Sequence, residues 1–399
     1  MPWTPEISSK GEETMEEILK VNHLNVVFDD ISGPLTAVYD VNFGLRRGEI
    51  LGIIGESGSG KSVTARSIIQ LAQVGKRGSI SGEILFQGTD LLKLKEKEMC
   101  RIRGSRITMV FQEPMTALNP AMTVEEQLSE VLKLHSPGER EKHRERILET
   151  LRQVQLPEPE ILMKKYPFEL SGGLRQRVVI AMAVIGKPDI IIADELTTAL
   201  DVTTQAEILS VLKKIAGEMG SAVILITHDL GVVAEIADRV LVMYRGMGVE
   251  ECRTASLFDE PLHPYSQGLL SSRPSNFNGR YSAIPGTVKQ NYGVFKGCPY
   301  SDRCPYALET CREKIPPSLS FGGEHRAACW KLCKEAAVSE IILKVEHLKK
   351  YYEERQGLFS RKKRINAALD DVSLEIRKGS IMGLAGESGS GNPQQERPC

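Results

Sequence analysis

The sequence has no apolar run long enough to cross a membrane. The longest apolar stretches, such as VVIAMAVIG at residues 178–186, are far shorter than the roughly 20 residues of a transmembrane helix. The first 20 residues, MPWTPEISSKGEETMEEILK, contain no basic segment followed by an apolar run, so we expect no secretory signal. We therefore expect a cytosolic chain, or one that reaches a membrane only through a partner.

The sequence also lacks an excess of charge of either sign. Lys and Arg together number 51, and Asp and Glu number 52. Such a balance gives no general positive field of the kind that attracts nucleic acid, so a nucleic-acid role would need a local basic patch. The 399 residues, 41% hydrophobic and 26% charged, are typical of a globular protein with room for two or three domains.

One long segment of the sequence occurs twice. ILKVNHL at residues 18–24 recurs as ILKVEHL at 342–348. In each copy a similar stretch follows, ending in GESGSGKS at 55–62 and in GESGSGNP at 386–393. A repeat separated by this much sequence indicates two copies of a whole domain rather than a solenoid.

Apolar patterning in the first copy predicts strands at 18–28 and 36–45. EILGII at 49–54 predicts a buried strand that leads into a glycine-rich loop. Residues 124–165 are polar and favour helix.

Two further apolar runs, PDIIIADE at 188–195 and SAVILIT at 221–227, are separated by a helical pattern at 203–219. This order of elements is typical of a βαβ unit, so we predict an α/β fold with a parallel core sheet.

The glycine-rich segment GESGSGKS fits the phosphate-loop pattern G-x-x-x-x-G-K-[ST] and lies between a predicted strand and a helical stretch. Glycines let successive backbone N–H groups point at phosphate oxygens, and a lysine and a hydroxyl then serve the terminal phosphates and Mg²⁺. A chance glycine turn is the simpler alternative. The expected nucleotide contacts come from Gly55, Glu56, Ser57, Gly58, Ser59, Gly60, Lys61, Ser62 and Val63.

Two acidic residues end the strand IIIADE. We expect Asp194 to join Ser62 in holding Mg²⁺ and Glu195 to act as the base that activates water. The alternative is an acid pair that caps a helix. His228 ends the next predicted strand, and we expect it to reach the γ-phosphate rather than only to cap a helix with its neighbouring Asp.

The segment LSGGLRQR at 170–177 resembles the signature motif of the ABC transporter ATPases. VFQEP at 110–114 is similar to that family's Q-loop, and TALD at 198–201 to its D-loop. The resemblance covers residues 18–251. It implies a parallel core sheet with an antiparallel β subdomain and a helical subdomain.

The same resemblance implies roles for residues that the phosphate loop does not explain. Phe28 would stack on adenine, Gln112 would sense the nucleotide and contact Mg²⁺, and His228 would be the switch histidine. Ser171, Gly172 and Gly173 would begin a helix and bind the γ-phosphate of an ATP held by a second ATPase subunit. Lys61, Glu195 and His228 would be the catalytic residues, with ATP and Mg²⁺ as cofactors.

Longer phrases are similar to the ATP-binding subunits of dipeptide and oligopeptide importers. Examples are FQEPMTALNPAMTVEEQL at 111–128 and HPYSQGLL at 263–270. This implies a peripheral subunit on the cytoplasmic face of the membrane, coupled to two permeases and indirectly to an extracytoplasmic solute-binding protein. Nickel and glutathione importers share much of this pattern. A non-transport ABC ATPase acting on ribosomes or nucleic acid is the alternative class.

One residue departs from the resembled family's pattern. That family usually has proline after the catalytic glutamate, where this chain has Leu196. Because proline fixes φ, we expect its loss to loosen the loop behind Glu195 and to slow hydrolysis without abolishing it.

Four cysteines are spaced C-x5-C-x6-C-x17-C. Clustered thiols in a reducing compartment favour metal binding over disulfides. Four thiolates suit a [4Fe-4S] cluster or a tetrahedral Zn²⁺, and the wide gaps between them favour the cluster over zinc. Reduced structural thiols are the third interpretation. The residues are Cys298, Cys304, Cys311 and Cys329.

These patterns divide the chain into an N-terminal tail (1–17), an ABC ATPase domain (18–260), an importer-type extension (261–337) and the start of a second ABC domain (338–399). In the second copy Asn392 and Pro393 stand where Lys61 and Ser62 stand in the first, so we expect nucleotide only at the first loop. The second copy is expected to be truncated, and a non-functional product is one interpretation.

Overall fold

The computed structural model describes most of the chain, in two compact units, Met1–Cys329 and Trp330–Cys399. Each unit is treated by itself below. The described residues are 16–72, 75, 78–111, 117–135, 142–196, 201–272, 284–289, 293, 295–322, 324–333, 341–355 and 363–377.

The first unit contains an antiparallel sheet of four strands. Its strand β1 (Glu17–Asp30) pairs with β2 (Gly33–Arg46) on one side and with β4 (Ser79–Phe86) on the other. Leu19 and Leu24 of β1 are fully buried. The predicted strands at 18–28 and 36–45 are confirmed. In spatial order the strands are β2 (Gly33–Arg46), β1 (Glu17–Asp30), β4 (Ser79–Phe86) and β5 (Thr89–Asp90).

A second sheet of eight strands forms the centre of this unit. Five neighbouring strands run parallel, and the remaining three continue the sheet at one edge with antiparallel pairing. The predicted parallel core sheet is therefore confirmed. In spatial order the strands are β11 (Ser318–Ser320), β12 (Arg326–Ala328), β10 (Met247–Arg253), β9 (Arg239–Tyr244), β3 (Ile50–Ile54), β8 (Ala222–Thr227), β7 (Ile190–Asp194) and β6 (Ile107–Val110).

The central strands β3, β7 and β8 are apolar along almost their whole length because both faces of the sheet are covered. Every residue of these three strands is buried. In β7, Ile191 and Ala193 contact one core, whereas Ile190 and Ile192 contact another. The first core packs against the helices, and the second packs against the antiparallel sheet. The period of two along each strand thus assigns its side chains alternately to the two cores.

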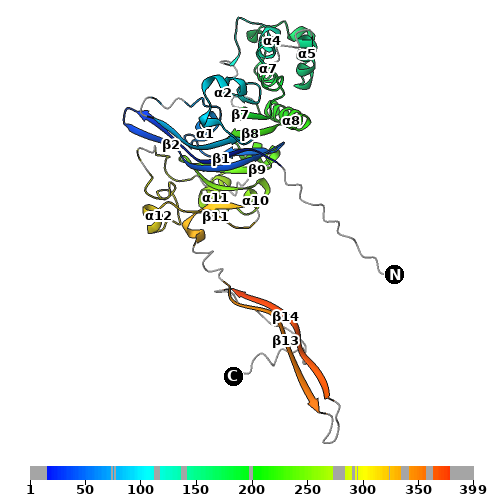
Figure 1. Ribbon diagram of the computed structural model, residues 1–399. Coiled ribbons are helices and arrows are strands. Elements are labelled where there is room, and N and C mark those ends of the chain that lie inside the picture. The colour runs from blue at the N-terminus through cyan, green and yellow to red at the C-terminus, as the bar shows by residue number, and fades with distance from the viewer. Residues whose placement is uncertain are drawn as a thin grey trace, which may run out of the picture. The chain divides into compact units, whose positions relative to one another are not determined.

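Helices follow the strands of the central sheet and cover its faces. Figure 1 shows α4, α5 and α7 gathered at one end of the first unit and α10, α11 and α12 at the other. Within the described residues, the stretch expected to be helical at 124–165 is helical at 124–135, 143–153 and 159–162, as predicted. The helices are α1 (Lys61–Ile68), η1 (Leu91–Lys93), α2 (Glu96–Ile102), α4 (Val124–His135), α5 (His143–Gln153), α6 (Pro159–Leu162), η3 (Pro167–Glu169), α7 (Gly172–Val184), α8 (Val202–Met219), α9 (Leu230–Ile236), α10 (Thr254–Asp259), α11 (Pro264–Ser271) and α12 (Glu309–Glu313).

None of the helices in the described part of the chain combines the length and the apolarity that a bilayer-spanning helix needs.

The cysteine-bearing extension continues the central sheet. β12 pairs with β10, and β11 pairs with β12. A hydrogen bond strengthens this edge, because His325 Nε2 lies 2.7 Å from Glu250 Oε1. Glu250 is 2% exposed and also accepts backbone N–H groups of Leu262 and His263. The extension therefore belongs to the same compact unit as the phosphate loop.

The second unit contains a two-stranded antiparallel sheet, β13 (Ile341–Arg355) and β14 (Lys363–Arg377). It reproduces an irregularity of the β1–β2 hairpin, since the register shifts between Val345 and Leu348 as it does between Val21 and Leu24.

The His–Asp pair at this bulge is repeated as well. His347 Nδ1 lies 2.7 Å from Asp371 Oδ1, and His23 Nδ1 lies 2.6 Å from Asp40 Oδ1. All four of these residues have positive φ. The sequence repeat is therefore also a repeat of local structure.

The two hairpins differ in how well their apolar faces are covered. Leu343 and Leu348 are 48% and 39% exposed, whereas their counterparts Leu19 and Leu24 are fully buried. In the first unit β1 also pairs with β4 and packs into a core. A two-stranded sheet by itself provides little burial for either face.

Acidification is expected to destabilise the first unit through His263. The side chain is buried, its Nδ1 accepts the N–H of Tyr265, and burial lowers the pKa of its imidazole to about 4. The unfolded imidazole has a pKa near 6.5. The contribution of this neutral histidine is therefore fully present above about pH 6.5 and is lost as the pH falls toward 4.

Urea unfolding at pH 7 and pH 5 measures this contribution. We expect wild type to lose about 2 kcal/mol more between these pH values than His263→Asn, which keeps a helix-capping acceptor but does not titrate. The exposed-site control His347→Asn is expected to behave as wild type. An equal loss in wild type and His263→Asn would contradict this account.

Candidate functional site

The phosphate loop connects the end of β3 to the start of α1. Gly55 has φ 149° and a Cβ there would lie 2.1 Å from the carbonyl oxygen of Met243. Gly60 has φ 96° and a Cβ there would lie 2.5 Å from the carbonyl oxygen of Ala37. Neither position can carry a side chain, because backbone atoms occupy the space. The loop is therefore held in its curled form by close contact with neighbouring strands.

Lys61 is folded back onto this loop. Its Nζ donates to the carbonyl oxygens of Gly55 at 2.7 Å and Glu56 at 3.0 Å, and to Ser59 Oγ at 3.3 Å. The residue is 5% exposed. Burial lowers the pKa of its amine, and the negative charges of Glu195, Asp194 and Glu56 offset only part of that effect. The ammonium group thus lies at the loop, where phosphate oxygens can replace the carbonyl acceptors.

The two acids at the end of β7, Asp194 and Glu195, lie beside the loop. Ser62 Oγ donates to Asp194 Oδ1 at 2.8 Å. Asp194 is 1% exposed, and burial raises the pKa of its carboxyl group. Its second oxygen, Oδ2, is buried without a hydrogen-bond partner. The nearest cation to it is Arg66, with Nη2 3.9 Å away. A buried carboxylate oxygen that accepts no hydrogen bond, next to a hydroxyl, suits a hard cation such as Mg²⁺.

Glu195 and His228 complete this edge of the sheet. His228 Nδ1 lies 3.6 Å from Glu195 Oε1. Glu195 has φ 49°, and its N–H donates to the carbonyl oxygen of Ile226 in β8. A glutamate with this backbone conformation is uncommon and is typical of functional sites. The neighbouring Leu196 is 3% exposed and packs into the core.

A cavity of about 530 Å³ lies between these groups. The structure therefore brings the phosphate loop together with the predicted base and the predicted switch histidine. The residues that line this cavity are Ser57, Gly58, Ser59, Gly60, Lys61, Ser62, Val63, Glu195 and His228.

The signature segment lies at the start of α7. Ser171 is the N-cap residue, and its side chain accepts the N–H of Leu174. Ser171 and Gly172 are exposed, and none of residues 171–173 lines the cavity at the phosphate loop. An exposed N-terminus of a 13-residue helix can bind an anion that another molecule presents.

The remaining predicted nucleotide contacts are located only in part. Phe28 lies in β1, half-buried against the core, and its stacking on adenine stays a prediction. Asp201 accepts the N–H of Thr204 as the N-cap of α8. Gln112 and residues 198–200 lie outside the described residues, as do Asn392 and Pro393 of the second loop.

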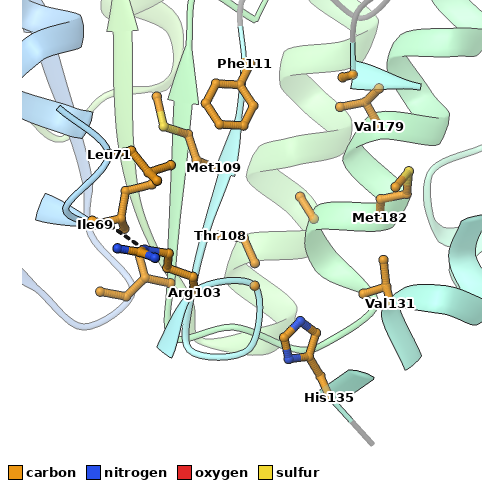
Figure 2. A pocket seen from close by; sticks show the side chains of 14 residues that line it. Ile69, Leu71, Arg103, Thr108, Met109, Phe111, Val131, His135, Val179 and Met182 are labelled. Atoms are coloured by element: carbon orange, nitrogen blue, oxygen red, sulfur yellow. Dashed lines mark hydrogen bonds between the residues drawn. The ribbon is translucent and has the colours of Figure 1, made fainter. Parts of the chain in front are cut away.

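A second cavity, of about 520 Å³, lies between β6 and the helices α4 and α7. Figure 2 shows Met109, Phe111, Val179 and Met182 facing this groove, with His135 at its rim. Arg103 also lines it and donates through Nε to the carbonyl oxygen of Ile69. Phe111 is 39% exposed although it is a large apolar side chain. The groove is therefore an apolar surface beside the Q-loop segment.

The four cysteines of the extension gather in one region. Cys298 donates its N–H to the carbonyl oxygen of Cys311 at 2.7 Å. Burial raises the pKa of the Cys298 thiol to about 12, and the thiols of Cys311, Cys329 and Cys304 raise it further because they are close enough to interact. No disulfide joins any of the cysteines that the structure describes.

The spacing of these thiols can be compared with what a metal needs. A tetrahedral zinc with Zn–S bonds of about 2.3 Å holds its sulfurs about 3.8 Å apart. Within the described ranges, only Glu250, Cys252 and His325 bring three ligand atoms within 4.8 Å of one another. The four cysteines are therefore more widely spaced than a mononuclear site requires. The carboxylate of Glu250 is already occupied by His325 and by two backbone N–H groups.

Contacts between the extension and the phosphate loop were not predicted from the sequence. Arg303 forms an ion pair with Glu56 in the loop, with Nη1 2.6 Å from Oε2. Tyr265 Oη accepts the backbone N–H of Glu56 at 2.8 Å. Tyr265 belongs to the phrase HPYSQGLL, which marked the extension but did not indicate its contact.

Comparison with known proteins gives two family matches. Residues 38–198 match the ABC transporter family, and residues 249–311 match the family described as oligopeptide/dipeptide transporter, C-terminal region. The oligopeptide transport ATP-binding protein OppD of Salmonella typhimurium is 45% identical over 332 residues, which is 83% of this chain and 98% of that protein.

Two further matches extend this comparison. OppD of Mycobacterium bovis is 40% identical over 401 residues, which is 94% of this chain and 65% of that protein. A dimeric structure of the ATP-binding cassette MJ0796 in a post-hydrolysis state, bound to ADP and Pi, is similar with a TM-score of 0.53 at 32% identity. The similarity covers 59% of this chain and 98% of that one.

Replacing Leu196 by the expected proline tests the loop behind Glu195. We expect Leu196→Pro to raise the rate of ATP hydrolysis severalfold, a change of less than about 1.4 kcal/mol in the barrier. Proline fixes its own φ and restricts the residue before it. Phosphate release at saturating ATP measures the effect.

The matched control is Leu196→Ala, which removes the buried side chain without restricting the backbone, and for which no increase is expected. Unchanged turnover in Leu196→Pro would refute the role assigned to this position.

Proposed function

This chain belongs to the ABC transporter ATPases of the oligopeptide and dipeptide importer family, and from this we propose that it binds and hydrolyses ATP to drive solute import. Its relatives are named as oligopeptide transport ATP-binding proteins, which favours peptides over nickel or glutathione as the solute. The observation that carries the proposal is the cavity in which Lys61, Glu195 and His228 meet.

In the proposed mechanism, Glu195 orients a water molecule and accepts its proton as the water attacks the γ-phosphate in line. Lys61 exchanges its carbonyl acceptors for oxygens of the terminal phosphates and neutralises charge there. His228, close to Glu195, contacts the γ-phosphate and holds it in line. Backbone N–H groups of residues 57–63 surround the other phosphates.

Mg²⁺ would be held by Ser62 and Asp194, together with Gln112. The fit rests on Oδ2 of Asp194, which is buried and accepts no hydrogen bond, and on the hydroxyl of Ser62 beside Oδ1. The ion supplies charge neutralisation at the phosphate oxygens. Binding would replace the hydrogen bond between these two side chains.

We propose that the complete site needs a second ATPase subunit. The exposed start of α7, with Ser171, Gly172 and Gly173, would bind the γ-phosphate of an ATP held by the partner. The partner's signature would in turn cover Lys61. Closure of the two subunits around ATP then provides the movement that a permease needs.

The permeases would contact the groove beside the Q-loop. It is apolar, it lies between the sheet and the helical subdomain, and Phe111 directly precedes Gln112. A segment of a membrane permease bound in this groove would be coupled to the nucleotide through the adjacent residues Phe111 and Gln112. We therefore propose that the protein lies peripherally on the cytoplasmic face of the membrane.

Residues 338–399 are proposed to be the beginning of a second ABC ATPase domain. Support comes from the repeated sequence, from the hairpin with the same bulge and His–Asp pair, and from the longer Mycobacterium bovis relative. Asn392 and Pro393 provide neither the amine nor the hydroxyl of the first loop. We therefore propose nucleotide binding at the first loop only.

The four extension cysteines are proposed to hold a [4Fe-4S] cluster. Their wide sequence spacing supports a cluster over zinc, and their mutual proximity is compatible with a shared ligand. Such a cluster is bound by four thiolates and can serve a structural role.

Glu195→Gln tests the proposed function. We expect the variant to bind MgATP but to hydrolyse it 10²- to 10⁴-fold more slowly, because the amide cannot accept a proton. Phosphate release and equilibrium binding of a fluorescent ATP analogue separate the two steps. The control Glu235→Gln changes an exposed glutamate of α9 and should leave both unchanged. Undiminished hydrolysis by Glu195→Gln would contradict the mechanism.

Metal analysis after anaerobic purification tests the cysteine assignment. We expect brown protein with about four iron atoms per chain, and loss of iron in Cys304→Ser but not in Cys100→Ser, which changes an exposed cysteine outside the segment. Stoichiometric zinc without iron would overturn the assignment.

A further inference from the structure

We propose that Arg303 of the cysteine-bearing extension is a positioning residue for ATP binding, because it neutralises and fixes Glu56 of the phosphate loop. The inference rests on the proposed ATPase function and goes beyond it, since it gives the extension a direct part in nucleotide affinity.

The contact is a two-point ion pair. Arg303 Nη1 donates to Glu56 Oε2 at 2.6 Å, and Nη2 donates to Oε1 at 3.1 Å. Parallel hydrogen bonds of this kind fix both the distance and the orientation of the carboxylate. The two residues are 247 positions apart in the sequence. The extension thus binds the phosphate loop through the side chain of Arg303.

Arg303 is itself held rigidly. Nε donates to the carbonyl oxygen of Pro285 at 2.7 Å, Nη2 to that of Ile284 at 3.3 Å, and Nη1 to Tyr244 Oη at 3.2 Å. The side chain is 6% exposed, whereas that of Glu56 is 30% exposed. The arginine is the fixed partner, and the glutamate of the loop is positioned against it.

A buried aromatic cluster supports the same contact. The rings of Tyr244, Tyr265 and Tyr300 lie with centroids 4.6 to 5.4 Å apart, and all three are at most 2% exposed. Tyr265 and Tyr300 come from the extension, and Tyr265 Oη accepts the backbone N–H of Glu56. Glu56 is therefore held through both its backbone and its side chain.

Charge explains why this matters for ATP. Glu56 places a carboxylate in a loop that has to receive a triphosphate. An unpaired negative charge near phosphate oxygens weakens their binding, most strongly at low salt. The guanidinium of Arg303 cancels that charge while it keeps the loop in position. Without Arg303 the charge of this loop carboxylate would have no paired cation holding it in place.

Equilibrium binding of MgATP to the full chain tests this. We expect Arg303→Met to weaken binding on the order of tenfold at low salt, and the loss to shrink as KCl is raised. Removing the charge as well, in Arg303→Met with Glu56→Gln, is expected to restore most of the affinity. Arg303→Lys, which keeps the charge without the two-point geometry, is expected to lie between wild type and Arg303→Met.

Glu56→Gln by itself is expected to bind MgATP more tightly than wild type, because Arg303 then carries an uncompensated positive charge toward the phosphates. Lys289→Met is the matched control. It removes a neighbouring exposed ion pair, with Asp302, that does not reach the loop. Thermal unfolding of each variant reports any loss of folded protein, so that affinities refer to folded chains.

The result that overturns the inference is an Arg303→Met variant that binds within twofold of wild type at low salt. A weakening that Glu56→Gln does not rescue and that salt does not change also overturns it, because a purely structural role predicts that pattern. If wild type itself fails to bind MgATP, the proposed function falls together with this inference.

Discussion

The site depends on one constraint, the meeting of the carboxyl ends of β3, β8 and β7 at the same edge of a parallel sheet. β3 ends at the phosphate loop, β7 ends at Asp194, and β8 is followed directly by His228. Strand pairing fixes these ends within hydrogen-bonding reach of one another, so three segments that lie far apart in the chain converge on one cavity. The burial of alternate side chains in two cores holds these strands in place, and it therefore also fixes the positions of the residues at their ends.

The extension is joined to this arrangement at two levels. Its strand β12 continues the central sheet through β10, and the Glu250–His325 hydrogen bond lies beside that junction. Its side chains Tyr265 and Arg303 then contact Glu56 of the phosphate loop. An ATPase fold that is usually described by its nucleotide motifs is here supported by residues that carry no nucleotide motif.

Much of this could be predicted from the sequence because it is local. Short patterns of residues, whose spacing has a physical reason, predict the strand before the loop, the two acids that end IIIADE and the helix that follows Ser171. The pairing of Arg303 with Glu56 could not be predicted, because nothing in either segment indicates its partner across so long a separation. The positive φ of Glu195 was also hidden, since a glutamate has no intrinsic preference for that conformation. Long-range packing determines both.

Arg303 is followed directly by Cys304. The residue that holds the phosphate loop and a residue of the four-cysteine group are therefore joined by a single peptide bond. The four-cysteine group and the contact with the phosphate loop therefore share one short stretch of backbone, so the position of the one is tied to the position of the other.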